Sequence, residues 1–179
     1  MIALEWQLVA PGDGPEISTS LTLAETDELR RLAKDADVLE VGSAYGYSTV
    51  VLGLVARSVV AVDPHRELNS FGVLLENLAA YGVTSRCVVE MRRDDSRTVL
   101  PALAGEGRTF DLVWIDGNHE ADVVAQDVQN ALRLLKPTGT LACHDYDEAT
   151  CPGVRQALDA WRVPPRLVDT LAVYGPGEW

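Results

Sequence analysis

Short runs of apolar residues alternate along the chain with longer segments in which apolar residues recur every three or four positions. The periodic segments predict helices over residues 22–36, 47–56, 71–82, 96–105, 120–136 and 152–162. The short runs predict strands over residues 37–43, 58–63, 86–91, 110–117 and 138–145, with two further short strands within 166–175. This alternation predicts a doubly wound, mostly parallel α/β sheet with helices on both faces.

Residues with special backbone preferences mark the ends of several predicted helices. Thr22, with Glu25 three positions later, has the spacing of a capping box, so a helix is expected to start there. Pro101 is expected to interrupt a short helix. Pro137 and Gly139 are expected to stop the long helix that precedes them.

A length of 179 residues suits one domain with a substantial core, and no internal repeat divides the chain. We expect a short N-terminal segment at residues 1–20 and one domain at 21–179, without a signal peptide. The three cysteines are odd in number and lack CxxC spacing, which argues against a disulfide framework and a thiolate zinc site. A reducing, cytoplasmic compartment fits this composition best.

The acidic balance of the chain disfavours several classes of partner. With 15 basic against 27 acidic residues, the formal net charge is −12. Such a surface repels phosphate backbones and anionic lipid. The most apolar tract, residues 49–62, contains Arg57 and is too short to span a bilayer. We therefore expect a small-molecule substrate and neither nucleic acid nor a membrane, while homo-oligomerisation is left open.

Small and ionisable residues gather just after the predicted strands. In open α/β sheets, ligands bind outside the carboxyl ends of the strands. The stretch LACHDYD at 141–147 could be a charged surface turn, but its place at the end of the fifth strand favours a site. The same rule places on one rim Gly42 to Gly46, Asp63, Asp95, Asp116 to His119, His144 and Asp145.

The turn after the first predicted strand is rich in small residues. Its spacing fails the dinucleotide fingerprint, because Ala44 and Tyr47 stand where glycines are required. The spacing present is acid-x-Gly-x-x-x-Gly, formed by Glu40, Gly42 and Gly46. Small residues let the backbone approach a ligand at a helix N-terminus, although a tight turn without a ligand would use the same residues.

Asp63 ends the second predicted strand about twenty residues after the glycines, where a carboxylate can accept two ribose hydroxyls. Asp95 and Ser96 follow the third strand, where adenine would lie. This combination favours an adenosine-containing cofactor. A plain turn aspartate is the alternative for each carboxylate.

Five segments occur in order and at suitable intervals: VLEVGSAYGYST, VAVDPH, RDDSRTVLPAL, FDLVWIDGNHEADVVAQDV and LKPTGTLACHDYD. Together they resemble the class I S-adenosylmethionine-dependent methyltransferases. The similarity covers roughly residues 20–175 and is greatest to O-methyltransferases of sugars and hydroxylated natural products, including the macrocin type. It implies a Rossmann-like single domain, S-adenosylmethionine as cofactor, and a hydroxylated small molecule as substrate.

The resemblance implies a role for each residue of the cofactor site. Glu40 and Gly42 would line the methionine part of the cofactor. Asp63 would bind ribose, and Asp95 and Ser96 would flank adenine. The residues that would shape the turn beside the methionine part are Ser43, Ala44, Gly46 and Ser48.

The resemblance also implies a metal site and a catalytic base. Asp116, which would border the cofactor as well, and the pair His144–Asp145 would hold a divalent cation, Mg²⁺ or Mn²⁺. The first member of that pair is histidine instead of an acid or amide, which moves the preference from Mg²⁺ towards Mn²⁺, Fe²⁺ or Zn²⁺. His119 matches the position of a general base, and with Asp116 it forms the expected catalytic pair.

Other interpretations of these residues stay open. His119 could begin a helix with its ring in water, His144 could pack against a backbone carbonyl, and Asp145 could be a turn residue. Both histidines and one carboxylate could instead form the iron site of a hydroxylase or oxidoreductase on this scaffold. A non-catalytic cofactor-binding domain is the third alternative. The sequence does not identify the substrate.

Overall fold

The computed structural model describes residues 7–160 and 163–179. The beginning of the expected N-terminal segment, residues 1–6, and residues 161–162 at the end of the last predicted helix lie outside the described residues.

A seven-stranded sheet forms the centre of the molecule, with strand order β5-β4-β3-β6-β7-β9-β8. The first five strands in this order are parallel, and β9 runs antiparallel to both of its neighbours. Successive strands start at β3 and build outward in both directions, which creates a topological switch point between β3 and β6. The strands are β3 (Asp37–Val41), β4 (Ser58–Val62), β5 (Val88–Arg92), β6 (Phe110–Ile115), β7 (Leu135–Cys143), β8 (Arg166–Val168) and β9 (Leu171–Tyr174).

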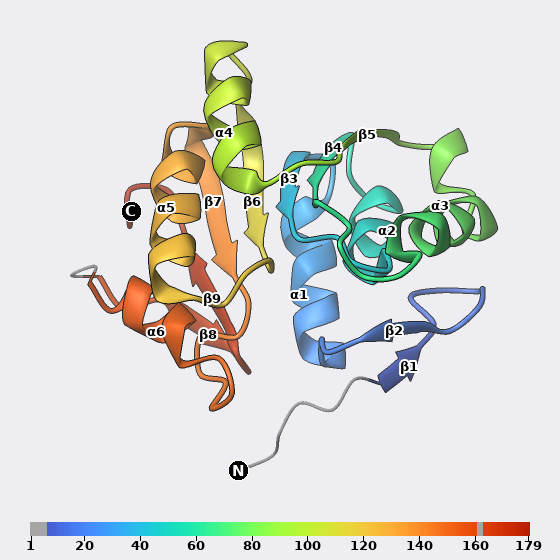
Figure 1. The fold of residues 1–179 in the computed structure, drawn as a ribbon, viewed down its shortest axis with the longest axis horizontal. Helices are drawn as coiled ribbons and strands as arrows, with labels where there is room; N and C mark the ends of the chain where they lie inside the picture. The colour runs from blue at the N-terminus through green and yellow to red at the C-terminus, as the bar shows by residue number, and fades with distance from the viewer. Residues whose placement is uncertain (1–6, 161–162) are drawn as a thin grey trace.

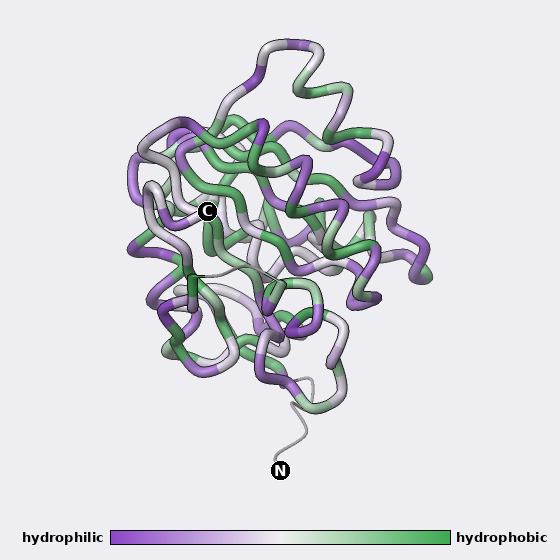
Figure 2. The backbone as a smooth tube through the Cα atoms, turned by 90° about the vertical axis from the view of Figure 1, so that its left-hand side faces the viewer, coloured by the Kyte–Doolittle hydropathy of each residue, from purple (hydrophilic) through white to green (hydrophobic). Residues whose placement is uncertain are grey.

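Helices cover both faces of the sheet (Figure 1). Two hydrophobic cores result, one between the sheet and α1, α2 and α3, the other between the sheet and α4, α5 and α6. Figure 2 shows the hydrophobic stretches running through the interior of the fold. The predicted α/β class is confirmed. The helices are α1 (Leu23–Ala33), α2 (Tyr47–Gly53), α3 (Ser70–Ala80), α4 (Ser96–Gly105), α5 (Ala121–Leu132) and α6 (Pro152–Leu158), with a short 3₁₀ turn at Val83–Ser85.

The end of α5 differs from the sequence-based prediction. α5 ends at Leu132, and Pro137 and Gly139 lie within β7, so they do not stop the helix. The register between β6 and β7 shifts in this stretch, so the missing N–H of Pro137 interrupts no regular ladder. The ammonium group of Lys136 lies 2.9 Å from the carboxylate of Asp111 and holds the start of the strand.

The expected interruption of α4 is also wrong, because the helix continues through Pro101. Leu100 and Leu103 on its inner face are fully buried. Burying each leucine stabilises the fold by roughly 1.5–3 kcal/mol. Together they offset the roughly 3 kcal/mol that a proline inside a helix costs.

The N-terminal segment forms a hairpin of β1 (Gln7–Val9) and β2 (Ile17–Thr19). Ile17 and Leu21 are buried in the core that contains α1 and α2. The hydroxyl of Tyr81 donates to the carbonyl of Pro15 over 2.6 Å, which fixes the hairpin beside α3. Within the described ranges, no helix is long and apolar enough to cross a membrane.

Candidate active site

A cavity of about 940 Å³ opens at the carboxyl ends of the parallel strands. It extends from Asp95 and Ser96 at one end to Asp145 and Cys151 at the other, and passes the turn after β3. The cavity therefore lies at the switch point between β3 and β6, where this topology predicts a bound ligand.

The turn after β3 requires glycine at its first position. Gly42 has a φ of +90°, and a Cβ atom there would lie 2.1 Å from the carbonyl oxygen of Asp116. Gly46, with a φ of +91°, forms the N-cap of α2. Ala44 adopts a φ of +41° although it is not glycine. Gly42 thus lets the β3 turn and the strand end that carries Asp116 approach each other closely.

Gly42→Ala is expected to destabilise the protein and weaken binding of S-adenosylhomocysteine, because the new methyl group would displace Asp116. We expect the free energy of unfolding to fall by about 2–3 kcal/mol more than in the control, at the upper end of overpacking costs. Gly107→Ala is the matched control, since Gly107 also has a positive φ (+72°) but no atom within 4 Å of the added Cβ. Urea unfolding and calorimetry measure both quantities, and equal losses in the two variants would contradict the predicted clash.

Asp63 at the end of β4 fixes the same turn. Its Oδ2 accepts hydrogen bonds from the backbone N–H groups of Ser43 and Ala44, each over 2.9 Å. Its Oδ1 accepts from the N–H of His65 over 2.6 Å. These bonds hold the carboxylate at the cavity wall, where its remaining lone pairs can face a ligand.

Asp95 and Ser96 start α4 and border the cavity, as the sequence predicts. Asp95 Oδ1 accepts from the backbone N–H of Arg97 over 3.1 Å and caps the helix. The guanidinium of Arg97, followed by that of Arg66, lowers the pKa of Asp95 to about 2.

Glu40 is fully buried behind the cavity and does not border it. Its two carboxyl oxygens accept from the hydroxyls of Ser48 over 2.6 Å and Thr49 over 2.7 Å. Ser48 does border the cavity. Burial raises the pKa of Glu40 from 4.5 to about 8, so this group is mostly protonated at neutral pH.

Glu40→Gln is expected to make stability less dependent on pH. Because its pKa in the folded protein exceeds the ordinary 4.5, Glu40's contribution is full below pH 4.5 and is lost as pH rises through about 8. At about 1.4 kcal/mol per pKa unit, the wild-type protein should lose several kcal/mol that the variant keeps. Urea unfolding at about pH 5 and about pH 8.5 tests this linkage. Parallel losses in both proteins would show that Glu40 carries no such pKa shift.

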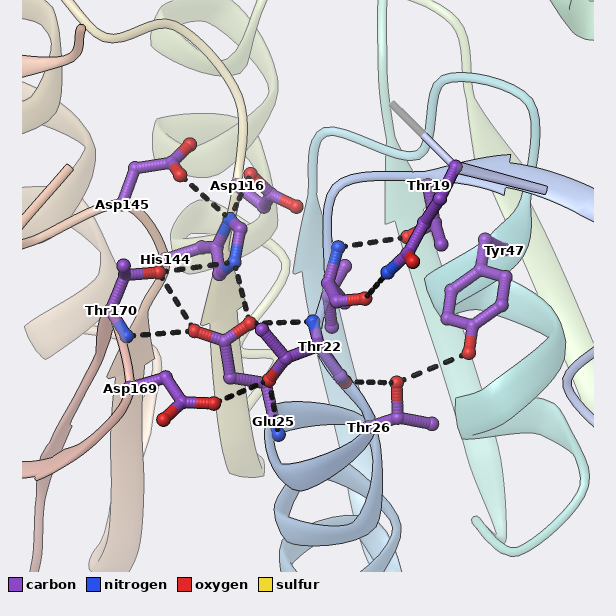
Figure 3. A network of polar contacts seen from close by, with 12 residues as sticks. Thr19, Thr22, Glu25, Thr26, Tyr47, Asp116, His144, Asp145, Asp169 and Thr170 are labelled. Carbon is purple, nitrogen blue, oxygen red and sulfur yellow. Dashed lines mark hydrogen bonds and ion pairs between the residues drawn. The ribbon is translucent and has the colours of Figure 1, made fainter. Parts of the chain in front are cut away.

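His144 follows β7 and lies in a buried polar cluster (Figure 3). Its Nδ1 lies 3.2 Å from Asp145 Oδ1 and 3.3 Å from Asp116 Oδ1, with no aligned hydrogen bond to either. Its Nε2 lies 3.3 Å from Glu25 Oε2. Burial alone would lower the pKa of His144, but the carboxylates of Asp116, Asp145 and Glu25 raise it well above 6.5.

Glu25 is a member of this cluster that the sequence interpretation treated only as a capping residue. The predicted capping box is present in α1, yet the side chain is fully buried. Besides His144, it accepts from the backbone N–H and the hydroxyl of Thr170 over 2.9 and 2.7 Å. The sequence did contain a signal, since Glu25 lies four and eight residues before Leu29 and Ala33, on the apolar face of the helix.

His119 lies in the loop before α5 and faces the cavity. Its Nε2 lies 2.9 Å from Asp145 Oδ2, and its side chain is 42% exposed. The contact with Asp145 raises the pKa of His119 above 6.5, against the opposing effect of burial. Asp145 itself has a φ of +59°, a left-handed conformation that aims its carboxylate between the two histidines.

Asp116, His144 and Asp145 have ligand atoms within 4.8 Å of one another, as a metal site requires. When Glu25 accepts the Nε2–H of His144, the Nδ1 lone pair faces two carboxylate oxygens. That arrangement is repulsive unless a proton or a cation lies between these atoms, so the residues fit a divalent ion. His119 belongs to a different group, with Asp145 and Cys151. The described residues therefore do not gather both histidines into one two-histidine iron site.

Asp127 is another residue that the sequence interpretation missed, and unlike Glu25 it borders the cavity. It lies on α5, is 1% exposed, and borders the cavity near Ser96. Burial raises its pKa to about 6. A carboxylate between Val124 and Val128 on the apolar face of the helix was the available signal.

The lining of the cavity is strongly acidic. It contains eight acidic side chains but only two guanidinium groups, those of Arg66 and Arg97. A negative lining favours a cationic ligand such as a sulfonium, and disfavours an anionic one. The eight acidic residues are Asp63, Glu67, Asp95, Asp116, Glu120, Asp127, Asp145 and Glu148.

A family model described as "Methyltransferase domain" matches residues 39–146, which include the turn after β3, Asp63, Asp116 and the His144–Asp145 pair. The chain belongs to this methyltransferase family. The volume, glycine turn and acidic lining of the cavity fit S-adenosylmethionine as the cofactor.

Several solved structures share this fold. Cofactor-bound Rv0187 from MTB superimposes with a TM-score of 0.69 at 25% identity, covering 92% of this chain and 84% of that one. The O-methyltransferase TomG from Streptomyces achromogenes, in complex with SAM, gives 0.68 at 20% identity, covering 88% and 82%. CalS11, a TDP-rhamnose 3'-O-methyltransferase of calicheamicin biosynthesis, gives 0.66 at 20% identity, covering 85% and 77%.

Among curated proteins, the protein-L-isoaspartate O-methyltransferase of Aliivibrio fischeri (strain MJ11) is 27% identical over 132 residues. The match covers 70% of this chain and 64% of that relative, so the chain spans less than two thirds of its length.

Proposed function

We propose that this methyltransferase transfers the methyl group of S-adenosylmethionine to a hydroxyl of a small molecule, such as a sugar or a hydroxylated natural product. One observation carries the proposal: apart from Glu40, which lies behind it, a single cavity is lined by the residues expected to bind the cofactor and by the His119–Asp145 pair. A base beside the transferred methyl group is what a neutral hydroxyl acceptor needs.

The cavity divides into parts that suit different portions of the cofactor. Asp63 accepts hydrogen bonds from the ribose hydroxyls, while Asp95 and Ser96 flank adenine. Ser48 borders the methionine portion, and Glu40 positions the hydroxyl of Ser48 from behind. The turn at 42–46 brings the backbone close to the methionine portion, and Asp116 borders it on the side of β6.

The chemistry requires positioning of an acceptor oxygen and removal of its proton. S-adenosylmethionine, when bound, supplies an already activated methyl group. His119 accepts the proton from the acceptor hydroxyl, while Asp145 orients the ring and stabilises the imidazolium. Asp116, His144 and Asp145 would hold a divalent cation, which supplies stabilisation of the alkoxide when bound.

The negative charge of the cavity favours a hydroxyl acceptor over a carboxylate acceptor. Isoaspartate, the residue in the name of the relative from Aliivibrio fischeri, would offer a carboxylate as the acceptor. A carboxylate is already ionised at neutral pH and needs no base. It would also be repelled by Asp116, Asp145 and Glu148. A neutral hydroxyl avoids this repulsion and makes use of His119.

The rate of methyl transfer is expected to rise with pH through an apparent pKa above 6.5. His119 must be neutral to accept a proton, and Asp145 raises the pKa of its imidazole above that ordinary value. Activity should therefore fall as pH decreases through this pKa and reach a plateau above it. A pH–rate profile measures this, and a profile without that limb would argue against a histidine base.

The cofactor part of the proposal is tested by calorimetry with S-adenosylhomocysteine. We expect binding to the wild-type protein and a loss of affinity in Asp63→Ala, because the variant loses both the ribose acceptor and the bonds that fix the turn. Asp147→Ala is the control, since this exposed carboxylate contacts Arg155 outside the cavity. Absence of binding at millimolar ligand would overturn the assignment of the cavity.

A further inference from the structure

A second cluster of metal-ligating side chains lies at the end of the cavity beside the proposed base. His119, Asp145 and Cys151 each place one ligand atom within 4.8 Å of the other two. The cysteine spacing argued against a zinc site built from several thiolates. The fold instead brings a single thiol, that of Cys151, next to one carboxylate and one imidazole. Asp145 lies 6 positions before Cys151 in the sequence, and His119 lies 32 positions before it.

Close backbone packing fixes Cys151 at this position. Cys151 precedes Pro152 at the start of α6. A Cβ atom on the next residue, Gly153, would lie 2.2 Å from the carbonyl oxygen of His119 and 2.7 Å from the backbone nitrogen of Ala121. The start of α6 therefore rests directly on the loop that carries His119, and both side chains border the cavity.

The donor types of this cluster differ from those of the neighbouring one. Asp116, His144 and Asp145 offer two carboxylates and one imidazole, whereas this group offers one carboxylate, one imidazole and one thiol. Thiolate and imidazole ligands favour Zn²⁺ over Mg²⁺. Three protein ligands around an open fourth position are a common arrangement for zinc.

We propose that His119, Asp145 and Cys151 form a binding site for a soft divalent cation such as Zn²⁺, and that the bound cation inhibits methyl transfer. The cation forms a bond to the sulfur of Cys151, whose proton is released to solvent. It also takes the lone pair of one His119 ring nitrogen, so the imidazole no longer accepts a proton from the acceptor. The inhibition, though not the cation site, rests on the proposed role of His119.

Cobalt titration of the full chain tests the site, because a thiolate bound to Co²⁺ gives a near-ultraviolet charge-transfer band that carboxylates and imidazole do not give. We expect this band in the wild-type protein and its absence in Cys151→Ser. Cys87→Ser is the matched control and should keep the band, since Cys87 is buried just before β5 and does not border the cavity. Calorimetry should show Zn²⁺ affinity falling by at least about 10- to 100-fold in Cys151→Ser, because losing a direct ligand should cost no less than losing an outer partner.

Two results would overturn the site: no charge-transfer band at saturating Co²⁺, or a band that persists in Cys151→Ser. Inhibition is measured separately, as loss of methyl transfer on adding Zn²⁺ that is reduced in Cys151→Ser. A band without inhibition would overturn the inhibitory role and leave the cation site standing. If His119→Ala also left turnover unchanged, the failure would lie with the proposed base.

Discussion

His119→Ala is expected to lower kcat by about 10²- to 10⁴-fold, the contribution typical of a positioned general base. Affinity for S-adenosylhomocysteine should change little, because the residues proposed to bind the cofactor, Asp63, Asp95 and Ser96, follow β4 and β5, whereas His119 follows β6. Steady-state kinetics and calorimetry measure the two quantities. This expected split between catalysis and binding rests on the proposed role of His119, whose Nε2 lies 2.9 Å from Asp145 Oδ2.

Asp122→Asn is the control for the His119 variant. Asp122 is exposed in the first turn of α5, close to His119 in sequence but outside the cavity lining. We expect near wild-type turnover. Unchanged turnover in His119→Ala would remove this histidine from the chemistry, and a matching loss of cofactor affinity would reassign it to binding.

Glu25→Ala is expected to lower the free energy of unfolding by about 3–5 kcal/mol, the cost of removing one partner from a buried ion pair. The substitution removes a carboxylate oxygen from beside His144 Nε2 and leaves the backbone N–H groups of Thr22 and Thr170 without that acceptor. Urea unfolding measures the loss. Asp27→Ala is the control on the same helix, because Asp27 is exposed and its pair with Arg30 should contribute at most about 1 kcal/mol.

The pH dependence of the Glu25 effect provides an independent check. Burial would raise the pKa of Glu25, but His144 lowers it to about 2, so its stabilisation is full above pH 4.5 and is lost as pH falls towards 2. The raised pKa of His144 gives stabilisation that is full below pH 6.5 and is lost as pH rises through that pKa. The difference between wild type and Glu25→Gln should be largest between pH 4.5 and 6.5. A difference independent of pH would show that the pair is not ionised.

Much of the fold follows from local patterns in the sequence. Runs such as VVAV and LVWI are apolar on both faces, and that property requires a sheet covered on both sides. The end of α5 could not be predicted from Pro137, because the register shift between β6 and β7 that accommodates this proline depends on tertiary pairing. The secondary-structure propensity of Pro137 takes no account of the strands beside it, and here the pairing of β7 with β6 decides its conformation.

The candidate site was predictable only in part, for a geometric reason. The ends of parallel strands meet at one edge, so the sequence could place Asp63, Asp116 and Asp145 on a common rim, and the structure brings them to one cavity. Glu25 and Cys151 reach the site from α1 and from the start of α6. The apolar face of α1 indicates that Glu25 is buried, but its contact with His144, like the position of Cys151, depends on how these helices pack against the sheet.

The most direct test of the proposed function is a methyl-transfer assay with labelled S-adenosylmethionine and two kinds of acceptor. One set contains sugars and hydroxylated natural products, and the other contains peptides with an isoaspartyl residue. The acidic cavity and the His119–Asp145 pair predict product only from hydroxyl acceptors, with the label in an alkali-stable ether and its formation lost in His119→Ala. Label transferred to isoaspartyl peptides as an alkali-labile ester, with no hydroxyl acceptor methylated, would contradict the account.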